Sequence, residues 1–326
     1  MPPPFSLKPP IPSIYGAVDG FRLPLTYQWN IGLNQSIGRS NALSISYVAA
    51  AGRHLLRQDF YVNPNADVTY AYLLRNTAFS DFDSLQVQFQ RRLAKGLQAL
   101  VSYTWAHSID NASNDSASHL AALQIDPLQD RGPSDFDIRH ALSGAFTYNL
   151  PGRQRLIKDW FLDSTVTFRT ATPVDVTYYA DVGFGAYNFR PDLVAGVPLY
   201  IADPNVPGGR RFNIDAFQIP DSYPGRQGTL GRNSLRGFPL EQVNLSIRRE
   251  FPLIEKARLQ FRAEMFNILN HPNFADPSGA MSSTSFGYST QMLSRDLGQG
   301  GVNGGLNPLY QVGGPRSIQL ALRIVF

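Results

Sequence analysis

Apolar residues alternate with polar or small residues along nine separate stretches of the chain. In residues 316–326, RSIQLALRIVF, the apolar positions are Ile318, Leu320, Leu322, Ile324 and Phe326. The same period of two runs through residues 26–37, 43–49, 84–92, 97–105, 140–150, 160–168, 242–251 and 257–265. This period predicts β-strands, and a length of about 9–11 residues suits a tilted strand that crosses a membrane.

Short and long connections alternate strictly between these stretches. The short connections are residues 38–41, 93–96, 151–159 and 252–256, and the long ones are 52–82, 107–137, 171–239 and 271–315. Barrels of the bacterial outer membrane have short periplasmic turns and long extracellular loops, whereas long structureless loops are uncommon in compact soluble domains. The sequence therefore predicts an all-β fold, an antiparallel up-and-down transmembrane β-barrel segment of about nine strands in the cell outer membrane.

Charged and aromatic residues follow the same division. The short turns carry Arg39, Arg91, Arg92, Lys95, Arg153, Arg155, Lys158 and Lys256. The long loops collect Asp59, Asp67, Asp81, Asp83, Asp110, Asp115, Asp126, Asp130, Asp135, Asp137, Asp203 and Asp221. The aromatic residues near strand ends are Tyr27, Trp29 and Trp105 towards the long loops, and Tyr148, Trp160, Phe251 and Phe326 towards the short turns. This arrangement resembles the two aromatic girdles of a membrane protein.

The last strand is expected to run down to the periplasm. Its alternate apolar residues would face lipid, and Gln319, Ala321 and Arg323 would face the lumen. An alternating last strand that ends on Phe326 resembles the signal that the barrel assembly machinery reads, so this machinery and outer-membrane lipid are the expected partners. The alternative is an ordinary half-buried final strand. The agreement between strand pattern, loop alternation and terminus favours the membrane strand.

The composition excludes several kinds of site and partner. The chain has 326 residues and no cysteine, which excludes disulfides and thiolate metal sites. The formal net charge of +4 does not indicate a nucleic-acid partner. No apolar run reaches the about 18 residues of a transmembrane helix, and the proline-rich start lacks the apolar core of a signal peptide.

The sequence contains no recognisable catalytic or metal-binding motif. The five histidines are scattered without zinc-ligand spacing, and no nucleophile elbow is present. Asp135 and Asp137 form a close carboxylate pair that glycosidases could use, but they stand just before a strand, where a structural role in the corner is favoured. We therefore expect no enzymatic activity, no metal and no cofactor.

Five charged residues lie on the face opposite the apolar positions of their strands: Arg248, Glu250, Arg258, Arg262 and Glu264. They could line a solute path, or they could form a structural charge network inside the barrel, which is the favoured interpretation. The charges also predict the register of the hairpin across residues 252–256, because like charges directly opposite are destabilising.

The predicted register places Phe251 opposite Ala257. Glu250 then faces Arg258, and Arg248 faces Gln260. Asn244 would face Glu264 in the same register.

Longer stretches resemble a known family. They are DRGPSDFDIRHALSGAFTYNLP (130–151), GTLGRNSLRGFPLEQVNLSIRREFPL (228–253), LQFRAEMFNILNHPNF (259–274) and GGPRSIQLALRIVF (313–326), with VDGFRLPLTYQWNIGLNQSIG (18–38) near the start. Together they resemble the carboxy-terminal barrel portion of Oar-like TonB-dependent outer-membrane receptors. The resemblance implies a plug domain, a TonB box and a barrel of about 22 strands.

The resemblance also sets the expected domain organisation and function. Residues 1–23 are interpreted as a proline-rich remnant of an extracellular loop, and residues 24–326 as the carboxy-terminal part of the barrel. The chain would be a truncated component of a solute-uptake receptor, with an unknown substrate, linked to the TonB system only through a missing amino-terminal part. The alternatives are a non-transporting surface adhesin and a soluble β-rich glycan-binding protein.

Overall fold

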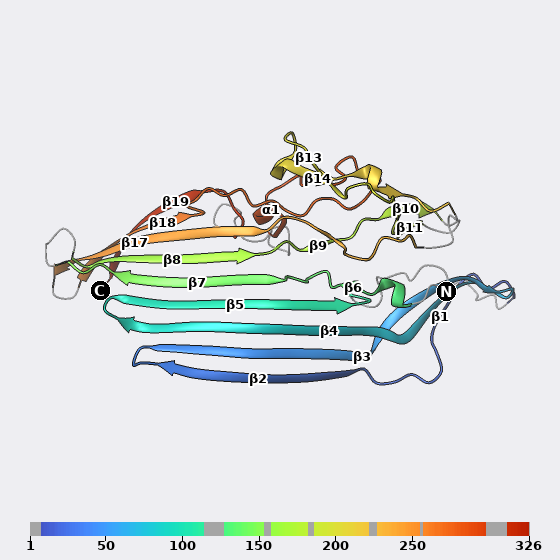
Figure 1. Ribbon diagram of the computed structural model, residues 1–326, viewed down its shortest axis with the longest axis horizontal. Helices are drawn as coiled ribbons and strands as arrows, with labels where there is room; N and C mark the ends of the chain where they lie inside the picture. Colours follow the sequence, from blue (N-terminus) through green and yellow to red (C-terminus); the bar gives the residue numbers. More distant parts are fainter. Residues whose placement is uncertain are drawn as a thin grey trace, which may run out of the picture.

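Nine long strands form the body of the protein. The computed structural model describes residues 8–113, 127–152, 158–181, 186–221, 227–254, 257–297 and 312–325. The long strands are β2 (Leu25–Ile37), β3 (Asn41–Asn65), β4 (Val68–Ala94), β5 (Leu97–Asp110), β7 (His140–Asn149), β8 (Trp160–Arg169), β17 (Leu240–Ile254), β18 (Ala257–Phe266) and β19 (Ser317–Val325). They lie in the order β19-β18-β17-β8-β7-β5-β4-β3-β2 (Figure 1). The predicted all-β antiparallel sheet of about nine strands is confirmed.

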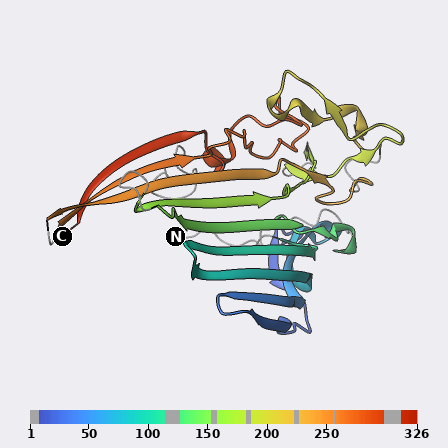
Figure 2. The same cartoon turned by 60° about the vertical axis from the view of Figure 1, so that its left-hand side comes forward.

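Each long strand pairs with its neighbour along the chain, so the sheet is an up-and-down meander. Figure 2 shows it as a curved wall. The short connections all lie at one end of the sheet, on the left in Figure 1, which we call the turn end, and the opposite end is the loop end. A two-residue turn joins β4 to β5 through Lys95 and Gly96, whose φ angles are 52° and 80°. Two successive positive φ angles match the twist of the flanking strands.

The register tilts the strands across the sheet. One continuous row of paired residues crosses all nine strands, in the order Ile318, Met265, Leu245, Ser164, Phe146, Ala99, Arg91, Asn41 and Ile37. Ile318 lies seven residues before Val325, the end of β19, whereas Ile37 is the last residue of β2 at the turn end. A barrel closes only with such a stagger between its strands.

The segment 52–82 differs from its prediction as a long loop. It is the outer part of a β-hairpin, because β3 continues to Asn65 and β4 begins at Val68. The pairing shifts register between Gly52 and Leu55, again between Leu55 and Arg57, and near the tip. These shifts interrupt the period of two, and the charged residues in the segment obscure its apolar face. The alternation therefore failed to identify a strand that is present.

The other long connections contain short elements at the loop end. The short strands are β1 (Ile14–Ala17), β6 (Gly132–Pro133), β9 (Pro173–Val174), β10 (Tyr178–Asp181), β11 (Ala186–Phe189), β12 (Asp192–Leu193), β13 (Tyr200–Ala202), β14 (Arg210–Phe212), β15 (Phe217–Gln218) and β16 (Leu235–Arg236). The helical turns are η1 (Pro127–Asp130), η2 (Pro207–Gly209), η3 (Ile214–Ala216) and α1 (Leu293–Leu297). No helix in these described ranges is long and apolar enough to cross a membrane.

Part of this region has a hydrophobic core of its own. The buried members are Val174, Val176, Phe212, Ala216, Phe217, Leu230, Leu235 and Phe286. They come from segments far apart in the sequence, and Phe286 packs edge-on against both Phe212 and Phe217. We call this unit, β9 to β16 with residues 273–297, the loop cap; Figure 1 shows β10, β11, β13 and β14 towards the loop end, on the upper right. The sequence suggested only extended loops here.

Residues 14–17 add a strand outside the meander. β1 pairs in parallel with residues 71–74 of β4, in the outer part of the long hairpin. The division of the chain at residue 23 stays a prediction.

Candidate functional site

The register gathers the alternating apolar residues of all nine strands onto one face of the sheet. Residues paired directly across a sheet share a face. Leu320 pairs with Ala263, Ala263 with Ile247 and Ile247 with Leu162, so the apolar positions of neighbouring strands coincide. We call this surface the apolar face and the opposite surface the polar face.

The last strand shows this division plainly. Ile318, Leu320, Leu322 and Ile324 lie on the apolar face and are each more than half exposed, with values from 52% to 71%. Gln319, Ala321 and Arg323 alternate with them on the polar face. Phe326 lies outside the described residues. An exposed apolar row of this kind indicates contact with an apolar partner.

All six described girdle residues lie on the apolar face. Tyr27, Trp29 and Trp105 occupy it towards the loop end, and their exposures are 56%, 49% and 55%. Tyr148, Trp160 and Phe251 occupy it towards the turn end. The two groups are therefore separated along the strands in the way that the sequence suggested.

The five predicted charged residues lie together on the polar face. Arg248 donates to Asp163 at 2.8 Å, and its guanidinium lies 4.3 Å from the centre of the Phe161 ring. Arg262 pairs with Glu264 at 2.6 Å. Arg258 pairs with Glu250 at 3.4 Å. These contacts agree with the network interpretation.

The predicted register of their hairpin is wrong by two residues. Arg248 lies opposite Arg262, and Glu250 lies opposite Gln260. The like charges are tolerated because each arginine has an acid elsewhere: Asp163 on β8 serves Arg248, and Glu264 on β18 serves Arg262. The residues of β17 and β18 alone do not include this acid, because Asp163 lies on the third strand, β8.

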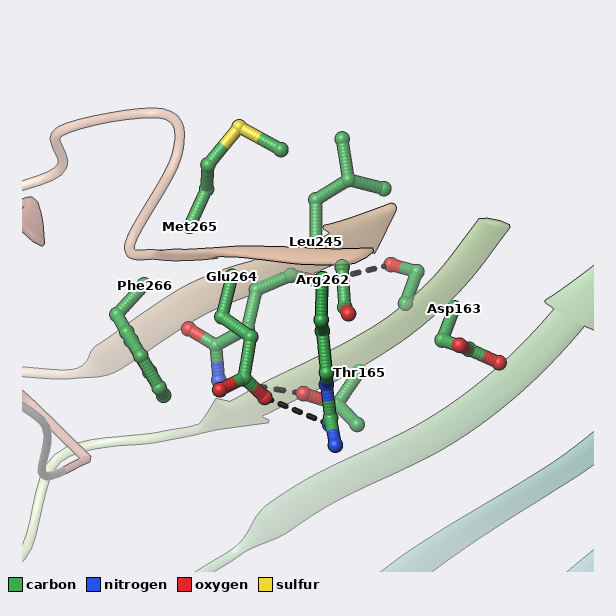
Figure 3. Close-up of a pocket in the computed structure, with 10 residues that line it drawn as sticks. Asp163, Thr165, Leu245, Arg262, Glu264, Met265 and Phe266 are labelled. Carbon is green, nitrogen blue, oxygen red and sulfur yellow. Dashed lines mark hydrogen bonds and ion pairs between the residues drawn. The ribbon is translucent and has the colours of Figure 1, made fainter. Parts of the chain in front are cut away.

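A hollow of about 230 Å³ opens on this part of the sheet (Figure 3). Its lining includes Asp163, Thr165, Asn244, Ser246, Arg262 and Glu264. The Asn244 amide donates to the Thr165 hydroxyl at 3.2 Å. The buried Ser246 hydroxyl has no hydrogen-bond partner among the described residues. The hollow therefore presents hydroxyl, amide and charged groups beside the apolar side chains of Leu245, Met265 and Phe266.

A second charged cluster, which the sequence did not reveal, is buried at the loop end. Arg57 is fully buried and lies between Asp59, at 3.2 Å, and Asp130, at 2.5 Å. Arg190 reaches the other oxygen of Asp130 at 2.8 Å. Asp130 thus ties β3 to the loop cap.

Asp137 organises a neighbouring corner. It accepts hydrogen bonds from the Ser108 amide at 2.8 Å and from Arg236 at 2.6 Å, and it pairs with Arg139 at 3.0 Å and with His107 at 3.2 Å. Burial alone would raise its pKa, but the hydrogen bonds from Arg236, Ser108 and His107 and the charge of Arg139 outweigh burial and lower the pKa. Asp137 therefore lies at the loop-to-strand corner with these contacts, and its structural role there stays a prediction.

Arg232 and Asp175 complete this cluster. Arg232 is buried and forms an ion pair with Asp110. The backbone amide of Asn233 donates to the Asp175 carboxylate at 3.2 Å. Burial raises the pKa of Asp175 to about 6, against the lowering effects of Arg190, of this hydrogen bond and of Arg232. The long loops contain arginines as well as aspartates, and these arginines could have revealed the cluster. The prediction from the sequence used only the aspartates.

Metal binding has no support in the described parts of the chain. Among residues 8–113, 127–152, 158–181, 186–221, 227–254, 257–297 and 312–325, no three histidine, aspartate or glutamate side chains are arranged to hold a metal ion. The arginines instead neutralise the buried carboxylates of the loop end.

Comparison with known proteins identifies a family and a fold. Residues 2–298 match the family model described as "Outer membrane beta barrel domain". The outer membrane transporter YddB from Escherichia coli matches with a TM-score of 0.53 at 9% sequence identity, over 94% of this chain and 33% of that chain. The ferripyoverdine receptor of the Pseudomonas aeruginosa outer membrane matches with a TM-score of 0.47 at 12% identity, over 93% and 27% of the two chains. No curated protein sequence matches. The chain thus spans about a third of the length of the transporter YddB.

Proposed function

The chain belongs to the outer membrane beta-barrel domain family, and from that premise we propose that it forms part of the wall of a TonB-dependent solute transporter. Its location is the cell outer membrane. The likeness to YddB shows the fold, a portion of such a barrel. Transport, and coupling to the TonB system through a further part of the protein, belong to the proposal.

The observation that carries the proposal is the continuous division of the sheet into two faces. Hydrocarbon contact suits the apolar face, with its two groups of aromatic residues at the levels of the lipid head groups. A charged side chain on a lipid-facing surface at mid-membrane costs about 2–4 kcal/mol. The charges of β17 and β18 lie on the other face, which we assign to the lumen.

The polar face is then the surface along which a solute passes or against which a plug packs. Its ion pairs, Arg248 with Asp163 and Arg262 with Glu264, balance one another. A wall of balanced charge with amide and hydroxyl groups suits polar solutes of either sign, so it leaves the substrate class open.

Single-cysteine labelling tests the assignment of the faces, because the natural sequence has no cysteine. Val101 and Ser102 are neighbours on the central strand β5 and point to opposite faces. In isolated outer membranes, we expect a water-soluble maleimide to label Ser102→Cys strongly and Val101→Cys weakly. A lipid-soluble maleimide should label both.

The same experiment separates the competing functions. A soluble glycan-binding protein would be released from the membrane fraction by alkaline washing, and both cysteines would be labelled alike by the water-soluble reagent. That result would contradict the transporter-wall proposal. A membrane-bound adhesin would keep the labelling pattern but show no solute uptake when the rest of the receptor is supplied.

A further inference from the structure

A hollow of about 400 Å³ opens on the apolar face, where β8 and β17 reach the loop end. Val166, Phe168 and Val243 contribute side chains of the apolar face to its lining. Residues 269–272, in the turn that follows β18, also line it. Its volume falls within the range of about 300–1,000 Å³ that is usual for sites that hold small molecules. The apolar lining of the hollow is thus continuous with the surface that we assign to hydrocarbon.

The turn beside the hollow is held by its own hydrogen bonds. Asn267 is buried, and its side-chain amide donates to the carbonyl of His271 at 2.8 Å. The side-chain oxygen of Asn267 accepts from the His271 amide at 3.1 Å. The backbone amide of Ile268 donates to the carbonyl of Val243 at 2.8 Å, which ties the turn to β17. Leu269, in this constrained turn, is 71% exposed and extends the apolar lining of the hollow.

The hollow lies near the aromatic residues of the loop end. Glu241 pairs with Phe168, Phe168 with Leu142, and Leu142 with Tyr103. Trp105 is the next residue on this face of β5. Tryptophan and tyrosine mark the level of the lipid head groups, and a charged residue such as Glu241 costs little on a lipid-facing surface only near that level. The hollow therefore lies where acyl chains meet head groups.

Glu241 gives the hollow an available carboxylate. Its side chain is half exposed, and the Nε2 atom of His271 lies 3.8 Å from it, beyond hydrogen-bond distance. Within the part of the chain that the structure describes, no group donates a hydrogen bond to this carboxylate. An ionised carboxylate accepts hydrogen bonds and donates none. The described lining contains no lysine or arginine. The hollow thus combines an apolar lining with a strong hydrogen-bond acceptor.

This combination distinguishes between two kinds of lipid. Where the acyl chains join the head group, a glycerophospholipid has ester groups, which only accept hydrogen bonds. An acylated amino sugar has amide and hydroxyl groups at the same level, and both donate. A hydrogen bond to a charged acceptor is stronger than one between neutral groups. The carboxylate of Glu241 therefore favours an acylated sugar over a glycerophospholipid.

We propose that this hollow binds an acyl chain of lipopolysaccharide in the outer leaflet, with an amide or hydroxyl group of the acylated sugar donating to Glu241. The inference rests on the proposed function, in which the apolar face contacts lipid and the loop end faces outward. It adds a lipid of defined head-group chemistry as a partner of the wall.

The test measures lipid binding to the assembled barrel. The full chain is produced together with a second polypeptide that carries the remaining strands, and the complex is purified in detergent and freed of lipid. Native mass spectrometry then follows a titration with purified lipid A, the acylated sugar of lipopolysaccharide. Glu241→Gln removes the charged acceptor at constant size, and we expect it to weaken binding about tenfold. Val243→Trp fills the hollow and should weaken binding at least as much.

Two matched controls keep the outcome specific. Ile247 lies on the apolar face of β17 outside the lining of the hollow, so Ile247→Trp adds the same ring elsewhere. Asp83 is an exposed acid on the apolar face of β4, so Asp83→Asn removes the same kind of charge elsewhere. Both controls should bind lipid A within about twofold of the natural complex. Heat-modifiable migration of each variant separates a loss of binding from misfolding.

The same titration with phosphatidylethanolamine and phosphatidylglycerol tests the identity of the lipid. The natural complex should bind lipid A about tenfold more tightly than either phospholipid. Equal or tighter binding of a phospholipid would overturn the inference. Tighter binding of lipid A to Glu241→Gln would do so as well, because it would place an anionic group beside this residue.

The variants of the apolar face can also contradict the inference. Unchanged binding of lipid A to Val243→Trp, or an equal loss in Ile247→Trp, would place the lipid outside the hollow. Absence of the chain from the membrane fraction would instead contradict the proposed function on which the inference rests.

Discussion

Asp175 gives the loop cap a pH-dependent stability. Burial raises the pKa of its carboxyl to about 6, above the ordinary value of 3.8. The folded state therefore holds the proton more tightly than the unfolded state, so this contribution is complete below about pH 4 and is lost as pH rises through about 6. Asp175→Asn keeps a neutral group at this position. We expect the variant cap to be more stable than the natural one at neutral pH, by about 1–3 kcal/mol.

Thermal unfolding of the cap at pH 4 and pH 7.5, monitored by limited proteolysis, measures this difference in stability. The two proteins should have similar midpoints at the lower pH and different midpoints at the higher pH. A variant that is less stable than the natural chain at pH 7.5 would show that the charged form of Asp175 is the favoured one.

Asp137 differs from Asp175, because the folded protein stabilises the charged form of the Asp137 carboxyl. Asp137→Ala would remove the carboxylate that accepts hydrogen bonds from Arg236 and the Ser108 amide in a buried corner. We expect a loss of about 2–4 kcal/mol in the stability of this corner. Hydrogen exchange of the amides around residues 108 and 134–137 would report it. Asp159→Ala removes an exposed carboxylate with a long ion pair and should change stability by less than about 0.5 kcal/mol.

At the scale of the element, Gly96 allows the two-residue turn of the β4–β5 hairpin. Its φ of 80° is unfavourable for any residue with a Cβ, and an added Cβ would lie 2.7 Å from the carbonyl oxygen of Asn149. Gly96→Ala should therefore destabilise the β4–β5 hairpin by about 1–2 kcal/mol. Urea unfolding of the chain in detergent measures the change. Gly16→Ala is the matched control, because its added Cβ meets nothing within 4 Å.

The last strand tests the assignment of the two faces. Leu320→Arg places a charge on the apolar face, and Ala321→Arg places the same charge on the polar face of β19. A lipid-facing arginine near mid-membrane costs about 2–4 kcal/mol, so Leu320→Arg should reduce the amount of assembled protein in the outer membrane far more strongly. Quantitative blotting of the heat-modifiable folded form, with the remaining strands of the barrel supplied as a second polypeptide, gives the answer. Equal assembly of the two variants would be incompatible with a lipid-facing Leu320.

These elements also show what the sequence could predict. A period of two identified the nine strands, because a one-residue slip would move every apolar residue of a strand to the wrong face. It failed in the outer parts of β3 and β4, where shifts in register interrupt the period. The register of β17 and β18 was wrong because Asp163, on a third strand, compensates Arg248. Local patterns do not contain contacts of this kind.

The loop cap lay beyond the sequence argument for a similar reason. Its core brings Val176, Phe212 and Phe286 together from three distant segments. Its ion pairs join Asp110 to Arg232 and Asp130 to Arg190, across more than fifty residues in each case. Short strands of two to four residues show no measurable period, so pairing across the chain determines them.

For the whole molecule, the direction of the edge strands limits how the sheet can close. β2 and β19 are the two ends of the meander of nine strands, and both run from the loop end to the turn end. Because their number is odd, direct pairing of β2 with β19 would be parallel, whereas every other seam between the long strands is antiparallel. A neighbouring sheet that completes an antiparallel barrel must contribute an odd number of strands. Its two edge strands must run from the turn end to the loop end.

This constraint predicts that the chain alone does not form a native pore. Every residue of β2 is exposed, and unpaired backbone groups at such an edge are unstable in hydrocarbon. We expect the purified chain, added to a planar lipid bilayer, to give no long-lived single-channel currents of uniform size. Supplying the remaining strands of the barrel as a second polypeptide should pair both edges and restore a folded, heat-modifiable species. Stable, uniform conductance from the chain alone would mean that β2 and β19 close against each other, or that copies of the chain assemble, despite the parallel seam that either arrangement requires.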